Sequence, residues 1–341
     1  MIQLNLAMLG FGNVGQAFVR LIQRKEAKLR QQYSLTMSIT AIATGSHGRA
    51  INPDGINPAQ ALSRMESGQS LDDLSTIPAP ADNLAFIQAS GADILLENTP
   101  VNYTDGQPAL DHIRTALQAG MHVVTANKGP VVHGYHALTA LAAEHNVRFL
   151  FESTVMDGAP VFGVYREALP AAVVDRISGV LNSTTNLILT RMESGESFDE
   201  AVAYAQSIGV AETDPSGDVD GWDSSVKISA LITVLMDTPF TPERVDRTGI
   251  RGITPAEIAQ AAAQGKRWKL LCEAWQDNGQ IKARVAPGMV SPDNPAYTID
   301  GTTSIVTLES DVLGALSLLE ADPGPHTTAY GLLADLLNAV K

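Results

Sequence analysis

A glycine-rich turn near the N-terminus constrains the fold more than any other feature of this chain. The apolar residues 4–9 lead into the sequence GFGNVG at residues 10–15, and residues 16–25 have the character of a helix. In this setting the first glycine permits a tight turn, the second admits a pyrophosphate close to the backbone, and the third lets the helix pack on the strand. The alternative is a tight turn without a ligand. The motif predicts a dinucleotide site formed by Gly10, Phe11, Gly12, Asn13, Val14 and Gly15.

The rest of the first 150 residues alternates between predicted strands and helices. Strands are predicted at residues 35–43, 93–97, 122–125 and 148–152, and helices at 83–89, 108–119 and 135–145. This alternation is typical of an α/β protein with a Rossmann-type, doubly wound parallel sheet, which binds ligands at the C-terminal ends of its strands. Asn98, Thr99, Pro100 and Lys128 follow strand ends, so we expect them at the cofactor. For Lys128 a solvated loop position is the alternative.

The segment after the second predicted strand bears on the choice of cofactor. This fold commonly places an acid there to bind the adenosine ribose, but residues 44–49 read TGSHGR and contain no acid. Ser46 and Arg49 could instead bind a 2′-phosphate, because a guanidinium pairs with phosphate in a bidentate manner. The segment therefore slightly favours NADP over NAD. An exposed loop position is the alternative for Arg49.

Length, charge and cysteine content limit the classes of protein that are possible. A chain of 341 residues predicts two domains: residues 1–150, completed by a C-terminal helix at 326–341, and residues 151–325 for substrate binding and dimerisation. The net charge of −14 argues against nucleic acid and anionic membranes as partners. The single cysteine, Cys272, is placed in a predicted helix at 266–275 and excludes a disulfide framework. These features predict a cytoplasmic protein with a small-molecule substrate.

The second domain contains two polar segments that could hold that substrate. The sequence NSTTN at residues 182–186 precedes a predicted helix at 187–193, either as a ligand loop or as a helix cap. An acidic run begins at Glu212, and its Asp218 or Asp220 could cap a helix that begins near Val219. Asp223 and Lys227 are four residues apart and therefore share a helix face. Such a group can bind a zwitterion and move a proton; an exposed ion pair is the alternative.

Strands of an antiparallel or mixed sheet are also expected in the second domain. They are predicted at residues 176–181, 281–285, 296–299 and 302–310, and a final helix at 328–340.

Taken together, these motifs resemble the homoserine dehydrogenase family. The resemblance runs through the glycine turn, residues 98–100, TANKGP at 125–130, residues 152–160, NSTTN at 182–186, and residues 212–227. It implies interconversion of L-homoserine and L-aspartate 4-semialdehyde with NADP or NAD. It further implies that Lys227 holds or protonates the reacting oxygen and that Asp223 and Glu212 bind the substrate ammonium, with Asp218, Asn182 and Thr184 in the same substrate site. Lys128 would assist proton transfer, and which lysine carries the proton stays open.

The family resemblance has further implications for assembly and ions. It implies a homodimer built through the central domain and an alkali-cation site, sodium or potassium, near Glu152, Val155, Asp157 and Ala159. The chain departs from the family at Ser183, where glycine is common, and in the segment 320–329, which has lost a glycine-rich pattern. Since the sequence stops at Lys341, a C-terminal regulatory domain is not expected.

Two other functions remain open at this stage. One is another NAD(P)-dependent amino-acid or semialdehyde dehydrogenase, and the other is a nucleotide-sensing homologue without turnover. Phosphorylating semialdehyde dehydrogenases need a cysteine nucleophile, and Cys272 lacks the glycine-rich or histidine context for one. A sensor has no need for Lys128 or for the pair of Asp223 and Lys227.

Overall fold

The computed structural model describes residues 1–341, which fall into two compact units. The first unit comprises Met1–Pro160 and Gly324–Lys341, and the second comprises Val161–Pro323. No helix in either unit combines the length and apolar character that a bilayer crossing requires.

A six-stranded sheet forms the centre of the first unit, in the order β3-β2-β1-β4-β5-β6. Its strands are β1 (Ile2–Leu9), β2 (Leu35–Ala43), β3 (Arg49–Ile51), β4 (Ile94–Glu97), β5 (His122–Thr125) and β6 (Phe149–Leu150). All neighbours pair in parallel except β2 and β3, which are antiparallel. The predicted doubly wound parallel sheet is therefore confirmed, with β3 as an additional antiparallel edge strand that the sequence did not reveal.

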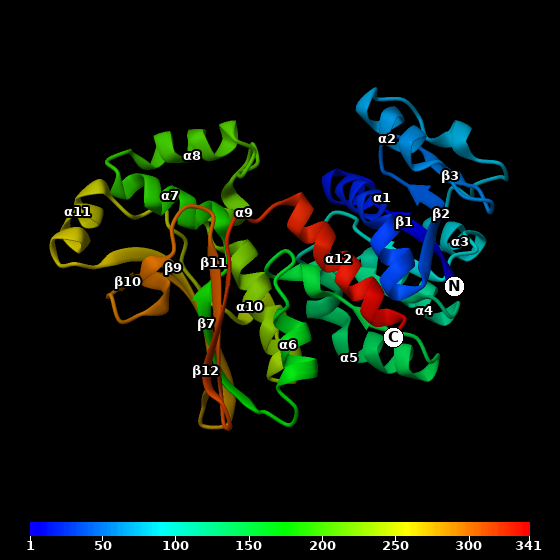
Figure 1. The fold of residues 1–341 in the computed structure, drawn as a ribbon. Coiled ribbons are helices and arrows are strands. Elements are labelled where there is room, and N and C mark those ends of the chain that lie inside the picture. The colour runs from blue at the N-terminus through cyan, green and yellow to red at the C-terminus, as the bar shows by residue number, and fades with distance from the viewer. The chain divides into compact units, whose positions relative to one another are not determined.

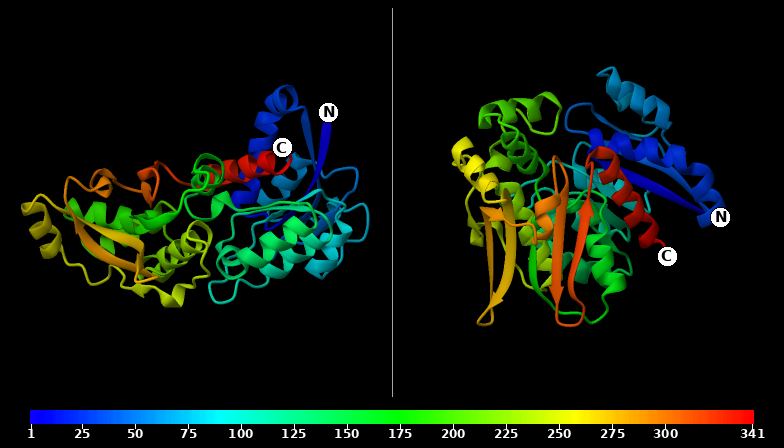
Figure 2. Two further views of the ribbon diagram at one scale, coloured as in Figure 1. Left: turned by 90° about the horizontal axis from the view of Figure 1, so that it is seen from below. Right: turned by 60° about the vertical axis from the view of Figure 1, so that its left-hand side comes forward.

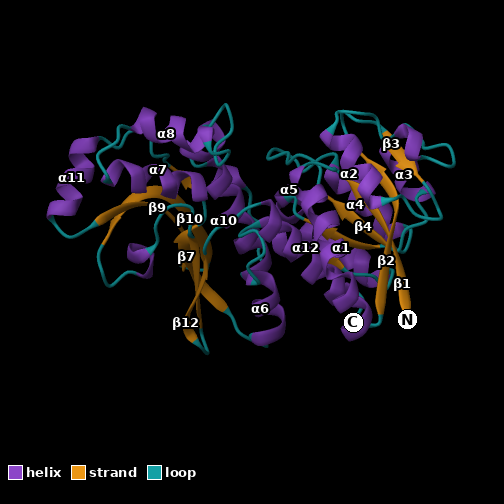
Figure 3. Cartoon of the chain, turned by 45° about the horizontal axis from the view of Figure 1, so that its top comes forward, coloured by secondary structure: helices purple, strands orange, loops and turns teal.

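Helices surround this sheet (Figure 3). They are α1 (Asn13–Tyr33), α2 (Pro58–Glu66), α3 (Asn83–Ala89), α4 (Ala109–Gln118), α5 (Lys128–Glu144) and α12 (Pro325–Ala339). The last helix, α12, contacts α1 despite the distance between them in the sequence, and the red α12 lies beside the blue α1 in Figures 1 and 2. Leu332 and Leu336 of α12 join the same buried core as Phe18 of α1.

The start of α5 differs from the prediction. The helix begins at Lys128 instead of Tyr135, so Lys128 is a first-turn helix residue and not a loop lysine. Asn127 caps this helix, because its Oδ1 accepts a hydrogen bond of 3.0 Å from the Gly129 N–H. Pro130 in the first turn has no N–H that would need a partner there.

The second unit contains a mixed sheet, as predicted, in the order β12-β11-β7-β9-β10-β8. Its strands are β7 (Val174–Val180), β8 (Asp246–Arg247), β9 (Arg267–Asp277), β10 (Gln280–Val290), β11 (Ser304–Ser310) and β12 (Gly314–Glu320). Only the short β8 pairs in parallel, with β10. The helices are α6 (Val161–Ala168), α7 (Ser183–Glu193), α8 (Phe198–Ser207), α9 (Ser216–Val219), α10 (Trp222–Leu235) and α11 (Pro255–Ala263).

The two faces of this second sheet differ in character. Helix α10 contacts β7, β9 and β10, and α7 contacts β9. Strand residues such as Ile177, Cys272 and Leu308 are buried. Residues that alternate with them, including Arg176 and Thr307, line a hollow of about 370 Å³.

Two secondary-structure predictions in this unit were wrong. Cys272 lies in strand β9 and not in a helix, because the segment pairs on both sides, with β7 and with β10. Burial raises the pKa of its thiol to about 12, so it is unsuited to act as a nucleophile. Residues 296–299 were expected as a strand, but Pro295–Thr298 is a 3₁₀ turn capped by Asn294.

Candidate active site

The glycine turn of the first unit has a local reason for each glycine. Gly10 has φ +87°, and a Cβ there would lie 2.2 Å from the Asn98 carbonyl oxygen. A Cβ on Gly15 would lie 2.9 Å from the Gly10 carbonyl oxygen, so the helix start packs tightly on the turn. A Cβ on Gly12 would meet nothing within 4 Å, so the backbone is open at that position. Gly12 is also the N-cap of α1 and provides no side-chain cap, which leaves first-turn N–H groups available to an anion.

A pocket of about 430 Å³ lies at the carboxyl ends of β1, β2 and β4. Parallel sheets bind their ligands at this edge. The residues that line the pocket include Gly10, Thr44, Arg49, Asn83, Thr99 and His112.

The two residues that were predicted to accept a 2′-phosphate have different partners in the structure. Arg49 lines the pocket, and its Nη1 donates to the Pro80 carbonyl oxygen at 2.8 Å and to Asn83 Oδ1 at 3.4 Å. Ser46 is exposed and lies 2.8 Å from His47 Nδ1 through its Oγ. The charge of Arg49 thus faces uncharged acceptors, although Asp72 Oδ1 accepts from its backbone N–H at 2.8 Å.

A buried carboxylate beneath the pocket was missed by the sequence analysis. Glu97, the last residue of β4, is fully buried and lies 3.5 Å from His112 Nδ1. It also accepts from the Thr125 hydroxyl at 3.3 Å, and Asn83 Nδ2 lies 3.1 Å from His112 Nε2. An acid at the end of a buried strand was the signal in the sequence that could have revealed this group.

Asn98 follows Glu97 at the same edge of the sheet. Its side-chain Oδ1 and Nδ2 are both buried and have no hydrogen-bond partner. Buried amide groups normally have partners, so the missing partners indicate a ligand here. Together with the open backbone at Gly12, this observation fits a nicotinamide cofactor at the pocket.

The second unit brings together residues from both polar segments of the sequence. Asn182 caps α7 by accepting from the Thr185 N–H at 2.8 Å. Its Nδ2 donates to Asp218 Oδ1 at 2.6 Å and to Asp223 Oδ2 at 3.0 Å. One amide therefore bridges two carboxylates, so the cap and ligand-loop interpretations of this segment are compatible.

Lys227 completes this group. Its Nζ lies 2.9 Å from Asp223 Oδ2 and donates to the Leu181 carbonyl oxygen at 2.7 Å. The side chains of Lys227 and Asp223 are 15% and 12% exposed, so this ion pair is not the solvated surface pair that was the alternative. We call Asn182, Asp218, Asp223 and Lys227 the polar cluster.

Two like charges lie close together in the polar cluster. Burial, and then the charge of Asp223, raise the pKa of Asp218. Lys227 and hydrogen bonds from Asn182 and Thr184 act in the opposite direction. A further cation placed beside the two carboxylates would therefore be stabilised.

Other parts of the acidic run were predicted incorrectly or lie apart from the cluster. Neither Asp218 nor Asp220 caps the long helix, because α10 begins after Gly221, which has φ +81° and provides no side chain. Asp220 instead pairs with Arg251. Glu212 is exposed, and its backbone carbonyl oxygen accepts from Gln206 Nε2 at 3.1 Å.

The segment expected to bind a cation lies against the start of α12. Asp157 has φ +41°, and its Oδ2 accepts from the Gly324 N–H at 2.6 Å and the Thr327 hydroxyl at 3.0 Å. The Glu152 N–H donates to Asp335 Oδ2 at 2.6 Å, and the Ala159 N–H donates to the Met156 carbonyl oxygen at 2.8 Å.

The dinucleotide-type sheet and the lysine among carboxylates are features of NAD(P)-dependent oxidoreductases that act on amino-acid-like substrates. Comparison with known proteins narrows this class. Residues 160–337 match the family model described as homoserine dehydrogenase, and residues 10–152 match the model of its NAD binding domain. The chain belongs to the homoserine dehydrogenase family.

Individual relatives cover nearly the whole chain. An NAD(+)-dependent homoserine dehydrogenase of Pseudomonas canavaninivorans is 36% identical over 99% of this chain and 96% of its own length. A homoserine dehydrogenase of Methanocaldococcus jannaschii is 32% identical over 98% of both chains. Among solved structures, a putative homoserine dehydrogenase of Archaeoglobus fulgidus has a TM-score of 0.86 and 29% identity, covering 98% of each chain. A hyperthermophilic archaeal homoserine dehydrogenase in complex with NADPH has a TM-score of 0.82 and 28% identity, covering 99% of this chain and 98% of its own.

Proposed function

We propose that this protein interconverts L-homoserine and L-aspartate 4-semialdehyde with a nicotinamide cofactor, a step toward threonine and methionine. The polar cluster of the second unit carries this proposal, because it combines an amine donor with two carboxylates in a partly buried setting. Homoserine offers the complementary groups, a hydroxyl and an ammonium.

Lys227 is suited to bind the reacting oxygen. An ammonium has three N–H donors, and two of those of Lys227 are directed at Asp223 and at the Leu181 carbonyl oxygen. The third can be donated to the substrate oxygen, where it stabilises the negative charge that develops during reduction of the aldehyde. The flanking carboxylate holds the lysine side chain in place.

Asp218 and Asp223 are suited to bind the substrate ammonium, with Asn182 holding both carboxylates. Burial, and then the charge of Asp223, raise the pKa of Asp218, and a substrate ammonium would offset both effects by stabilising the charged carboxylate. Thr184 contributes a hydroxyl at the same place. Glu212 would contact the ammonium only after its exposed side chain changes conformation, so we assign it a secondary role in substrate binding.

The bound cofactor supplies the hydride for reduction and accepts it in oxidation. The residues proposed to hold it are the turn 10–15, Asn98, Thr99 and Pro100, with Lys128 at the start of α5 as a further proton-transfer group. The orphaned Asn98 amide supports this assignment.

A direct assay tests the activity. Purified protein is mixed with aspartate 4-semialdehyde and NADPH or NADH, and the absorbance of the reduced nicotinamide is followed. Turnover with either cofactor is the expected result. Cofactor binding without any turnover would instead favour a nucleotide-sensing protein, and turnover only with other aldehydes would favour a different dehydrogenase.

For cofactor choice, we propose that NADP(H) is preferred over NAD(H) through Arg49. Arg49 supports this proposal because the residue lines the pocket and its guanidinium is bonded to uncharged acceptors. Charge-assisted hydrogen bonds contribute about 1.5–3 kcal/mol, which corresponds to a preference of roughly 10- to 100-fold. The relatives include one named as NAD(+)-dependent and one solved with NADPH, so the preference has to be measured for this chain.

Steady-state kinetics with both cofactors test the Arg49 proposal. Arg49→Ala is expected to lower kcat/KM for NADPH and leave that for NADH nearly unchanged. Arg20→Ala is the matched control, since Arg20 is an exposed arginine that pairs with Glu66 on the surface. Equal efficiency of wild type with the two cofactors would refute the proposal.

We further propose that a sodium or potassium ion binds at the segment containing Glu152, Val155, Asp157 and Ala159. Because the Asp157 carboxylate is used at the start of α12, backbone carbonyl oxygens would be the main ligands. Thermal unfolding in NaCl, KCl and choline chloride at equal ionic strength tests this. Equal melting temperatures in all three salts would contradict it.

A homodimer through the second unit is the proposed assembly. Edge strand β12 and the turn before it expose Val312, Leu313 and Leu319 at 69%, 55% and 56%, and exposed apolar edges are usually covered. Light scattering after gel filtration should give twice the mass of the 36.1 kDa chain. A monomer at micromolar concentration would refute this assembly.

The reduced, buried Cys272 supports a cytoplasmic location.

A further inference from the structure

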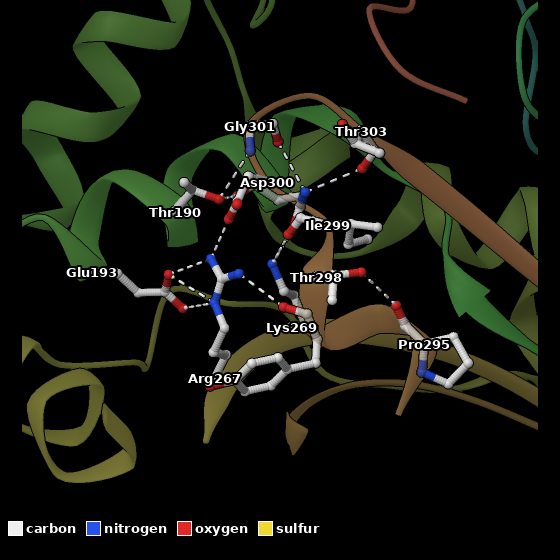
Figure 4. A network of polar contacts seen from close by, with 12 residues as sticks. Thr190, Glu193, Arg267, Lys269, Pro295, Thr298, Ile299, Asp300, Gly301 and Thr303 are labelled. Carbon is white, nitrogen blue, oxygen red and sulfur yellow. Dashed lines mark hydrogen bonds and ion pairs between the residues drawn. The ribbon is translucent and has the colours of Figure 1, made fainter. Parts of the chain in front are cut away.

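A fully buried lysine lies beside the start of α7, and the proposed mechanism does not use it. Lys269 of β9 is 0% exposed. Its Nζ donates to Asn186 Oδ1 at 2.8 Å and to the Ile299 carbonyl oxygen at 2.6 Å, as Figure 4 shows for Ile299. Burial of an ammonium group costs free energy even when it is hydrogen-bonded, and an apolar side chain would fill the same space without that cost.

Asn186, the hydrogen-bond partner of Lys269, makes several further hydrogen bonds. Its side chain is fully buried, and its Nδ2 donates to the Gly301 carbonyl oxygen at 3.0 Å and the Thr303 carbonyl oxygen at 3.1 Å. Thr190 adds a second tie, because its Oγ1 donates to the Asn186 carbonyl oxygen at 2.7 Å and accepts from the Gly301 N–H at 3.2 Å. Asn186 therefore joins α7 to the segment 299–303.

Asn186 lies one helical turn after Asn182. The Asn186 N–H donates to the Asn182 carbonyl oxygen at 3.2 Å, which is the first hydrogen bond of α7. The Asn182 side chain bridges Asp218 and Asp223, and the preceding carbonyl oxygen, of Leu181, accepts from Lys227. The position of the first turn of α7 thus sets the geometry of the whole polar cluster.

A cluster of charged side chains lies close enough to Lys269 to act on its pKa. Arg267 pairs with Glu193 and Asp300, and Figure 4 shows these pairs next to Lys269. Burial and the charge of Arg267 lower the pKa of Lys269 to about 8, while Glu193 and Asp300 act in the opposite direction. The lysine is bonded directly to neutral oxygens, so its bonds fix positions and do not form an ion pair.

We propose that Lys269 is a positioning residue for substrate binding: it fixes the Asn186 amide and the segment 299–303 against the first turn of α7, and through Asn182 it sets the two carboxylates that receive the substrate ammonium. This inference rests on the proposed function of the polar cluster. It predicts that the loss of Lys269 weakens the binding of homoserine and leaves the cofactor site of the first unit unchanged.

The experiment compares four single variants and one double variant, all folded, with wild type. Lys269→Met keeps an unbranched side chain that is one atom shorter and removes the hydrogen-bond donors. Lys282→Met is the control for loss of a lysine from the same sheet, because Lys282 is 54% exposed and pairs with Asp277 at the surface. Leu308→Ala controls for lost stability, since it removes core volume from β11. Asn186→Leu removes the partner of Lys269, and it is also combined with Lys269→Met.

For Lys269→Met we expect kcat/KM for homoserine to fall roughly 10- to 100-fold, mainly through KM, since small displacements of positioned groups have effects of that size. The Kd for NADPH, measured by calorimetry, should stay within about twofold of wild type. Neither control should raise KM. The kcat/KM of the double variant should fall no further than that of the more impaired single variant, because both substitutions break the same connection between Lys269 and Asn186.

Three results would overturn the proposal: an unchanged KM in Lys269→Met, losses that multiply in the double variant, or an equal rise of KM in Leu308→Ala. Should Lys269→Met not fold, Asn186→Asp takes its place. It keeps an acceptor for Lys269 but loses the donors to Gly301 and Thr303, so an unchanged KM there would equally refute the proposal. Absence of homoserine turnover in wild type would refute the proposed function instead, and calorimetric titration with homoserine would then still test the role of Lys269.

Discussion

Replacement of Lys227 by alanine should stop turnover while leaving the cofactor site intact. The substitution removes the donor proposed for the reacting oxygen, and the loss of one such donor typically lowers kcat by about 100-fold or more, or about 2.7 kcal/mol. NAD(P)H should still bind, because the glycine turn, the pocket and Asn98 all belong to the first unit.

The same substitution should also lower stability. Lys227 and Asp223 are 15% and 12% exposed, so the change removes a partly buried ion pair beside the charge of Asp218. Removal of one partner of a buried pair costs roughly 3–5 kcal/mol, and the remaining exposure of this pair puts the expected loss at about 3 kcal/mol or less. Such a loss leaves a typical protein folded, since total stabilities are about 5–15 kcal/mol.

Three measurements check the prediction for Lys227→Ala: kcat from nicotinamide absorbance, Kd for the cofactor from calorimetry, and the free energy of unfolding from urea titration. Lys282→Ala is the control, because it breaks an exposed Lys–Asp pair in the same unit. It should leave kcat unchanged and alter stability by less than about 1 kcal/mol. A folded Lys227→Ala protein with kcat within tenfold of wild type would refute the assigned role.

Asp218→Asn should raise the KM for homoserine yet stabilise the protein at pH 7. Burial raises the pKa of Asp218, so the folding stability of wild type declines as pH rises through that pKa. In urea titrations from pH 4 to 7, the free energy of unfolding of the variant should therefore increase relative to that of wild type. A constant difference across that range would contradict the reasoning. Gly12→Val should fold normally but bind cofactor at least tenfold more weakly, whereas Gly10→Ala should lower the melting temperature, because of these two positions only Gly10 has no room for a Cβ. Calorimetry measures the first effect and thermal unfolding the second. Normal cofactor binding by Gly12→Val would count against a cofactor site at the glycine turn. Cys272 should not react with a thiol reagent at pH 8 until the protein is unfolded, since burial raises its pKa to about 12, and rapid labelling of native protein would disprove its burial.

The sequence predicted best where local signals and tertiary structure agree. The glycine turn and the strands around it follow from motifs whose residues are close together, and β2 has the bounds that were predicted. Strand β9 was taken for a helix because its alternation of apolar and polar residues is irregular and its pairing partners lie far away in the sequence.

In the candidate site too, contacts between residues close in the sequence were predicted, and contacts between distant residues were not. The ion pair of Asp223 and Lys227 could be predicted, since four residues separate them on one helix. The bridge from Asn182 to Asp218 joins residues 36 positions apart, and the helix cap at Gly221 depends on a left-handed backbone. Glu97 could have been noticed as an acid at the end of an apolar strand, but Lys269 could not be assigned a role from sequence, because its complete burial is a property of the fold.

The contact between α12 and the first 160 residues has a consequence for synthesis of the chain on the ribosome. The first unit lacks Leu332 and Leu336 in its core, and the Ser153 hydroxyl lacks its bond to the Thr328 carbonyl oxygen, until the last helix emerges. At a translation rate of about 5–20 residues per second, the remaining 180 or so residues take roughly 10–35 s. During that interval the apolar surface of α1 is uncovered, so the nascent chain should be a client for chaperones that shield hydrophobic segments until release.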